Sequence, residues 1–202
     1  MSESQTQPET PAAFTELVQR FEAMPKEKRL VAAYECIRDI AYGDIGSRNP
    51  FDVLTAEKGT CSGKHALLRL LLTELQYDVE SWFALHDFGR FPIHPWPDAL
   101  AKFHGSTIPD YHDFLKVKVD GEWLAIDAVF DAPLALLGFP MLQWDGKTSM
   151  ELPVEASELF PADGDMEDHK KRLIAALPDD VQTQLKAFLT AMTAWLDAAR
   201  AS

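Results

Sequence analysis

Apolar residues recur every three or four positions near both ends of the chain, which is the spacing of a single helix face. Pro25 separates the first two such segments, and Pro178 precedes the last. The final segment carries a stripe typical of a helix that packs on a core. The residues before the first helix are polar and acidic, and we expect them to form a disordered tail. The approximate bounds are 1–12 for the tail and 14–24, 26–41, 165–177 and 179–199 for the helices.

Strand patterns occupy the middle of the chain. Residues 114–119 and 122–128 alternate apolar and polar positions on either side of Asp120-Gly121. An Asp-Gly pair between two such runs strongly predicts a tight hairpin. Residues 79–85 form a less regular strand.

A third kind of pattern starts at Gly59 and Cys61, where a strongly apolar helical run begins and continues to about residue 75. Thr60 or Ser62 could cap this helix by accepting a hydrogen bond from a free backbone N–H. The partial positive charge at a helix N-terminus favours thiolate, so the pKa of Cys61 should fall. Cys61 is therefore a candidate nucleophile. The alternative is that Cys61 is a small buried hydrophobe.

Two segments lack a regular pattern. Residues 42–58 read as a loop, and residues 88–109 form a long irregular stretch that holds four prolines and four large aromatic residues. Such aromatic residues gain free energy by covering an apolar surface. We expect the long stretch to pack over or beside Cys61, as a lid, and to supply the pocket residues Phe91, Trp96 and Phe103. The alternative is an ordinary loop that packs away from the cleft.

The hairpin register decides where His112 and Asp127 lie. With a two-residue turn, Val119 pairs with Glu122, Phe114 lies opposite Asp127, and His112 is diagonal to Asp127, within reach of a hydrogen bond. A three-residue turn would send the two side chains to opposite faces. Asp127 sits in an apolar run and needs a polar partner. The alternative is that both side chains point to solvent.

Cys61, His112 and Asp127 together compose a plausible catalytic triad. The thiolate would attack a carbonyl, and His112 would accept and return the proton. Asp127 would hold the imidazole in one tautomer and stabilise its charged form. A charged imidazole beside the sulfur would favour thiolate further.

These motifs resemble the transglutaminase-like superfamily, a branch of the papain-like cysteine enzymes. The resemblance covers about residues 50–131 and rests on Gly59-Thr60-Cys61, the hairpin from His112 to Trp123, and Trp123-Leu-Ala-Ile-Asp127. It implies an α+β fold in which the nucleophile helix packs on an antiparallel sheet, within a single domain of residues 13–202 that has added N- and C-terminal helices. It also implies the Cys-His-Asp triad.

The chain departs from the family pattern in three places. Asp113 takes a position that is usually small, and Ala128 follows the acid where proline is common. The family's oxyanion-hole side chain comes from upstream of the cysteine, where Asn49 and Tyr42 are the candidates. The superfamily includes crosslinking, hydrolytic, deamidating and non-enzymatic members, so the resemblance does not imply a substrate class.

Composition limits the binding partners and the cellular location that we expect. A net charge of −13 disfavours binding to nucleic acid or to anionic membranes. Two cysteines, Cys36 and Cys61, do not make a disulfide framework, and Cys36 reads as a packing residue. No signal-peptide pattern and no apolar run of the ~20 residues needed to span a bilayer is present, so we expect a cytoplasmic protein.

Three functional hypotheses follow. The first is a cysteine enzyme that acts on an amide or ester of a peptide, a protein or a small molecule, through an acyl-thioester and then hydrolysis or acyl transfer. The second is a non-catalytic binding module on the same scaffold. The third is a metal site that uses Cys61 and His65 with His86, His94 or His104. These histidines show no ligand spacing, and His65 reads as a packing or helix-surface residue. We expect no cofactor and no metal.

Overall fold

The computed structural model describes residues 10–201, and its centre is an antiparallel sheet of four strands in the order β5-β4-β3-β6. Residues 1–9 of the predicted tail lie outside the described residues, and the first helix begins at Ala12. Two further short strands pair in parallel. The strands of the sheet are β3 (Val79–Asp87), β4 (Pro109–Val119), β5 (Glu122–Ile126) and β6 (Glu158–Pro161), and the short pair is β1 (Ala41–Tyr42) and β2 (Lys58–Gly59).

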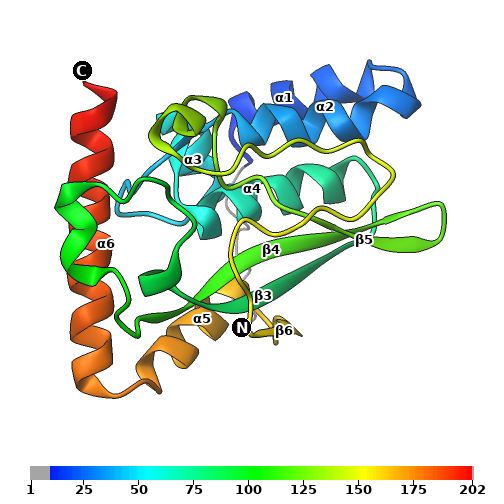
Figure 1. Cartoon of the computed structure of the whole chain (residues 1–202). Helices are drawn as coiled ribbons and strands as arrows, with labels where there is room; N and C mark the ends of the chain where they lie inside the picture. Colours follow the sequence, from blue (N-terminus) through cyan, green and yellow to red (C-terminus); the bar gives the residue numbers. More distant parts are fainter. Residues whose placement is uncertain (1–9, 202) are drawn as a thin grey trace, which may run out of the picture.

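The first four helices lie on one side of the sheet, and the last helix stands beside the end of its long strands (Figure 1). One buried apolar cluster joins the first four helices to β4 and β5, and a second joins α6 to the opposite face. Four of the helices match the patterns at the two ends of the chain to within about three residues. The helices are α1 (Ala12–Glu22), α2 (Lys26–Arg38), α3 (Pro50–Ala56), α4 (Cys61–Glu74), α5 (Met166–Ala175) and α6 (Asp179–Arg200).

The hairpin has the predicted two-residue turn. Val119 pairs with Glu122, and Leu115 pairs with Ile126. Asp120 and Gly121 both have positive φ, which is the turn geometry that matches strand twist. The predicted core face is buried against α4 through Leu115, Val117 and Ile126. The α4 helix therefore packs on the antiparallel sheet, which confirms this part of the expected fold.

Some predicted boundaries were wrong. The segment 42–58 is not a continuous loop, because Asn49 caps the short helix α3 by accepting a hydrogen bond from the Phe51 N–H at 2.8 Å. Strand β4 begins at Pro109, so His112 lies inside the strand rather than before it. Neither predicted cap for α4 forms, since Thr60 occupies the cap position without a side-chain hydrogen bond and Ser62 lies inside the helix.

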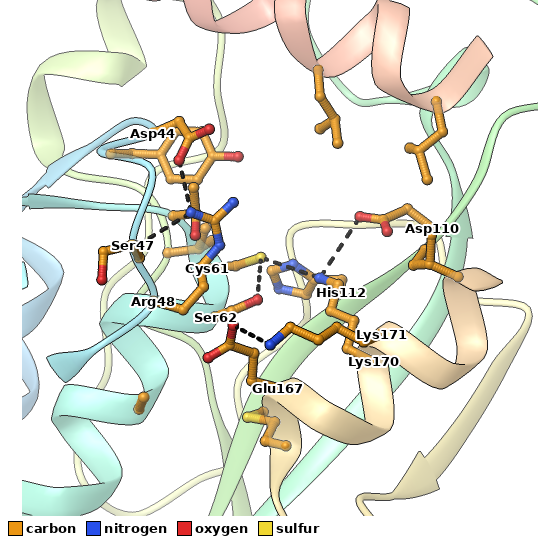
Figure 2. A pocket seen from close by; sticks show the side chains of 18 of the residues that line it. Asp44, Ser47, Arg48, Cys61, Ser62, Asp110, His112, Glu167, Lys170 and Lys171 are labelled. Carbon is orange, nitrogen blue, oxygen red and sulfur yellow. Dashed lines mark hydrogen bonds and ion pairs between the residues drawn. The ribbon is translucent and has the colours of Figure 1, made fainter. Parts of the chain in front are cut away.

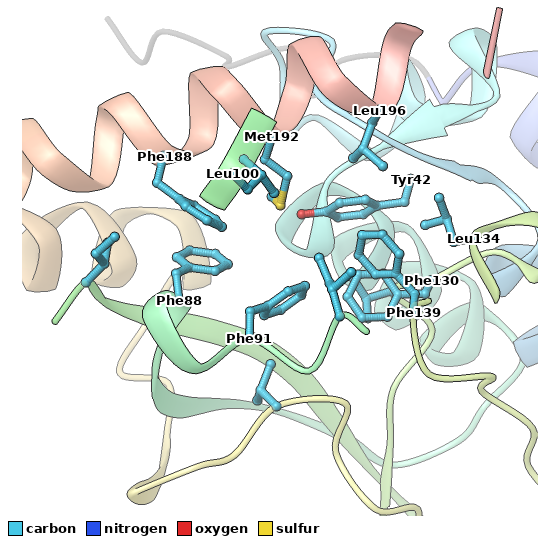
Figure 3. Close-up of a cluster of buried hydrophobic side chains, with 14 of the residues drawn as sticks. Tyr42, Phe88, Phe91, Leu100, Phe130, Leu134, Phe139, Phe188, Met192 and Leu196 are labelled. Carbon is cyan, nitrogen blue, oxygen red and sulfur yellow. The ribbon is translucent and has the colours of Figure 1, made fainter. Parts of the chain in front are cut away.

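The aromatic stretch 88–109 contains regular structure and packs against the rest of the fold. It contains 3₁₀ helices at Phe88–Arg90 and Asp98–Phe103. The rings of Phe88 and Phe103 both pack on Phe188 of α6, with centroid separations of 4.4 and 5.3 Å. Figure 3 shows the Phe88 side chain beside Phe188, which projects from α6. The stretch thus connects α6 to the end of the sheet.

A buried lysine fastens helix α4 to the rest of the fold. Lys64 is fully buried, and its ammonium donates to the carbonyl oxygens of Arg38, Ile40 and Val129 at 2.8, 2.6 and 2.8 Å. These acceptors lie at the end of α2, just before β1, and just beyond Asp127. Lys64 therefore fixes α4 relative to the segment that carries Asp127.

We expect Lys64→Met to lower the free energy of unfolding by about 3 kcal/mol, because one buried and two partly buried carbonyl groups lose their donor. Urea denaturation followed by circular dichroism measures this change. Arg69→Met removes an exposed charge from the same helix and should cost less than about 0.5 kcal/mol. Equal effects of the two substitutions would show that Lys64 does not fasten the helix.

Candidate active site

Cys61 is the first residue of α4, and its partly exposed side chain opens into a cavity of about 940 Å³. The cavity is also lined by His112 from β4, so the helix does bring the cysteine to the hairpin. Figure 2 shows both side chains pointing into the same space, with α5 on its other side. Sequence alone could not establish this meeting of α4 and β4.

The contact between His112 and Asp127, which the register predicted, is confirmed. His112 Nε2 lies 2.5 Å from Asp127 Oδ2, and Asp127 is fully buried. The second carboxylate oxygen accepts a hydrogen bond from the Val129 N–H at 3.0 Å and lies 3.6 Å from His65 Nε2. His65 is itself buried, and its Nε2 accepts a hydrogen bond from the Ala128 N–H. His65 is therefore a packing residue that also borders the acid.

The opposite charges of His112 and Asp127 stabilise each other and outweigh the cost of burying them. Burial opposes a charge on His112, but Asp127 and Cys61 outweigh it and raise the pKa of His112 to about 10. Burial likewise opposes the Asp127 charge, yet His112 and His65 hold the pKa of that carboxyl well below its usual range. At neutral pH the pair is therefore an imidazolium and a carboxylate.

This pair predicts a pH dependence of stability. Because the folded-state pKa of His112 is raised to about 10, its contribution is complete below about pH 6.5 and is lost as the pH rises through about 10. The advantage of wild type over His112→Gln in unfolding free energy should therefore shrink by more than about 1 kcal/mol between pH 6.5 and 10. Urea titrations at several pH values measure it, and a constant difference would contradict the charged pair.

The thiol contacts a second group of polar side chains. Cys61 Sγ donates to Asp113 Oδ2 at 3.3 Å, and the Ser62 hydroxyl donates to the same oxygen. Lys170 Nζ of α5 lies 3.1 Å from that oxygen and 3.8 Å from Sγ. Three side chains thus meet around Asp113, which is fully buried.

A second histidine and carboxylate also line the cavity that Cys61 and His112 line. His86 and Asp110 lie directly opposite each other on β3 and β4, with His86 Nε2 3.8 Å from Asp110 Oδ2. Burial lowers the pKa of His86, although Asp110 opposes the shift. Burial favours the neutral form of Asp110, but Lys170 and His86 hold its pKa well below its usual range. Lys170 therefore faces two carboxyl groups, those of Asp110 at 3.9 Å and Asp113 at 3.1 Å.

Only part of the predicted pocket lines the cavity. Phe91, Tyr42 and Asn49 do. Trp96 and Phe103 do not, because Trp96 packs on His104 and Phe103 is buried against Phe188. The stretch 88–109 reaches the cavity through Phe88 and Phe91 at its beginning.

The two upstream candidates for an oxyanion donor, Asn49 and Tyr42, both line the cavity. The Asn49 side-chain oxygen caps α3, which fixes its amide group at the start of that helix. Tyr42 is buried at the cavity wall, and burial, followed by the charge of Cys61, raises the pKa of its hydroxyl. Tyr42 therefore stays protonated at neutral pH and remains able to donate a hydrogen bond.

Sequence reasoning missed Lys170 as a neighbour of the thiol. It named His86 only as a possible metal ligand and did not pair it with Asp110, although both line the cavity. Asp113 was recognised only as a departure from a family pattern. His86 and Asp110 could have been paired by extending the antiparallel register of β3 and β4, but no local signal places Lys170 near Cys61.

No protein-family model matches the chain, and no curated protein matches it in sequence. Two solved structures are similar in part. One is described as "a Putative Cysteine Protease from Cytophaga hutchinsonii", with 22% identity and a TM-score of 0.41 over 60% of this chain and 38% of that one. The other is described as a TGase, with 14% identity and a TM-score of 0.41 over 62% of this chain and 35% of that one. The chain thus matches less than two fifths of either solved structure.

Two further features of residues 10–201 concern metal ligands and helix length. Within this range no cluster of three or more His, Cys, Asp or Glu side chains is arranged to hold a metal ion. None of the helices in the same range combines the length and apolar character needed to cross a bilayer.

Proposed function

We propose that the chain is a cysteine-dependent enzyme that acts on the carbonyl of an amide or ester through an acyl-thioester on Cys61. The observation that carries the proposal is the buried His112–Asp127 pair, which faces the cavity into which Cys61 opens. A nucleophile, a base and a group that orients the base are the parts that such chemistry needs.

The proposed reaction has two steps. Because His112 is already an imidazolium at neutral pH, the reactive form of the site is the Cys61 thiolate beside charged His112. In the first step this thiolate attacks the carbonyl carbon. The bond to the leaving amine or alcohol breaks as His112 gives its proton to the leaving group, which leaves an acyl-thioester. In the second, His112 takes a proton from water or an amine, which attacks the thioester carbon and releases the Cys61 sulfur. Asp127 stabilises the charged His112 throughout.

The oxyanion of each tetrahedral intermediate needs donors. The first N–H groups of a helix have no partner within it, so the backbone N–H of Cys61 is one candidate. The Tyr42 hydroxyl, at the wall of the same cavity, is the second. Asn49 is a weaker candidate because its side chain caps α3.

The cavity suggests which acyl groups fit. Its far side is apolar and is formed by Phe88, Phe91, Phe130, Leu185 and Leu189. We propose a neutral or cationic substrate, a peptide, protein or small amide, whose acyl part carries an apolar side chain. Whether water or an amine accepts the acyl group stays open in this proposal.

Intact-protein mass spectrometry with p-nitrophenyl esters tests the proposal. A phenylacetyl ester should add one acyl group on the peptide that contains Cys61, and hydroxylamine should release it. A succinyl ester, which is anionic, should react much more slowly. Failure to form an adduct, or equal acylation of Cys36, would contradict the proposed enzyme.

One observation favours the alternative, a binding module that keeps the scaffold without catalysis. The Asp113 carboxylate lies 3.3 Å from Sγ, and a negative neighbour disfavours thiolate. In that case no ester would acylate Cys61. Cys61→Ser would then bind a partner as tightly as wild type does, and loss of binding on this nearly isosteric change would exclude the module.

A further inference from the structure

The carboxylate of Asp113 poses an electrostatic problem for the proposed nucleophile. In the structure its Oδ2 accepts the hydrogen bond from the Cys61 thiol. Once the thiol loses its proton, that bond disappears and two negative charges face each other at about the same distance. Asp113 cannot relieve this by turning to water, because it is fully buried and its other oxygen has no hydrogen-bond partner.

Lys170 is placed where it can offset this repulsion. Its ammonium lies 3.8 Å from Sγ, which is close to the 3.3 Å between Sγ and Asp113 Oδ2. Since Coulomb energy varies inversely with distance, the attraction is comparable to the repulsion. The side chain is largely buried, so salt screens these interactions weakly.

We propose that Lys170 is the counter-ion that allows the Cys61 thiolate to form beside Asp113. Asp113, in turn, holds the ammonium at 3.1 Å, so the pair places a positive charge against the sulfur. Although burial alone would lower the pKa of Lys170, Asp110 and Asp113 raise it above its ordinary value, so the ammonium stays charged. This inference rests on the proposed role of Cys61 as nucleophile.

Other charged groups also face the thiol, and the test has to separate Lys170 from them. His112 contributes a positive charge that Asp127 balances. Arg48 is paired with Asp44 at 2.7 Å. The remaining titratable side chains that line the cavity are Tyr42, Arg69, His86, Asp110, Asp165, Glu167 and Lys171.

The test is the pH dependence of Cys61 alkylation by iodoacetamide, followed peptide by peptide with mass spectrometry. Lys170→Met should raise the pH of half-maximal rate by about one unit or more, because a cation next to the sulfur is lost. Asp113→Asn should lower it. The double variant, which removes both charges of the pair, should return toward wild type.

Lys171→Met is the matched control. Lys171 follows Lys170 on α5, but its side chain is 65% exposed and binds Glu167 at 2.8 Å. The substitution removes the same charge from the same helix. Because Lys171 is exposed, solvent screens its charge, and the pH of half-maximal alkylation of Cys61 should change much less. Equal midpoints in the two single lysine variants would overturn the proposal.

The same data separate two kinds of failure. A wild-type midpoint near that of an ordinary free thiol would contradict the proposed nucleophile itself. A low wild-type midpoint that Lys170→Met leaves in place would contradict only the counter-ion. If Lys170→Met does not fold, the Asp113→Asn variant is compared with the double variant. The difference between their pH values of half-maximal alkylation measures the effect of the Lys170 charge. A difference of zero would reject the proposed counter-ion.

Discussion

Asp127→Asn should lower kcat/KM for an ester substrate on the order of 10⁴-fold, as expected when the acid of a triad loses its charge. Asp127 holds His112 through Nε2 and accepts the Val129 N–H on its other oxygen. An asparagine can keep one of these contacts through its amide oxygen. Its amide nitrogen, which donates hydrogen bonds, then lies at the other contact, where the carboxylate oxygen had accepted one. Either His112 takes the wrong tautomer, or the Val129 N–H is left unsatisfied.

Asp120→Asn is the control for this substitution. It makes the same chemical change at an exposed position in the turn of the same hairpin, and asparagine tolerates the positive φ there. Its kcat/KM should stay within about twofold of wild type, since a substitution at an exposed position away from the cavity usually has a small effect. A folded Asp127→Asn protein with near-normal turnover would show that His112 acts without its acid.

Cys61→Ala should abolish both acyl-enzyme formation and turnover while the fold remains. The thiol is partly exposed at the start of α4 and opens into the cavity, so its loss leaves no buried hole in the core. The free energy of unfolding should change by less than about 1.5 kcal/mol. Intact mass, ester turnover and urea denaturation measure the three outcomes.

Cys36→Ala is the matched control for that variant. Cys36 is also half-buried, but its sulfur accepts a hydrogen bond from Arg20 at 3.2 Å, far along the chain from the hairpin. This variant should acylate at the wild-type rate. If Cys61→Ala unfolds the protein, or if it still forms an adduct, the cysteine is a packing residue and the proposed chemistry fails.

The sequence was sufficient to predict the central pair because hairpin register is local. Asp120 and Gly121 accept the positive φ values of a two-residue turn, and the register then brings Asp127 to His112. An apolar run around Asp127 indicated that the carboxylate needed a partner. Periodicity also predicted α4 and the terminal helices, since each repeats its pattern over three or more turns.

Features that depend on distant segments could not be predicted. Lys170 reaches Cys61 across 109 positions of sequence, and no local pattern indicates where α5 docks. The position of Phe103 depends on α6, because its ring packs on Phe188 of that helix. Helix α3 is too short for periodicity to reveal it, although Asn49 followed by Pro50 is a readable start signal.

The most direct test of the account compares the two cysteines of the wild-type protein with one reagent. Iodoacetamide should alkylate Cys61 much faster than Cys36, and the rate at Cys61 should reach half its maximum well below the ordinary thiol pKa of about 8.5. Cys36 serves as the internal reference, because both peptides are measured in the same digest. Slow alkylation of both cysteines, at equal rates and with an ordinary pH dependence, would contradict the claim that Cys61 is a nucleophile activated by His112 and Asp127.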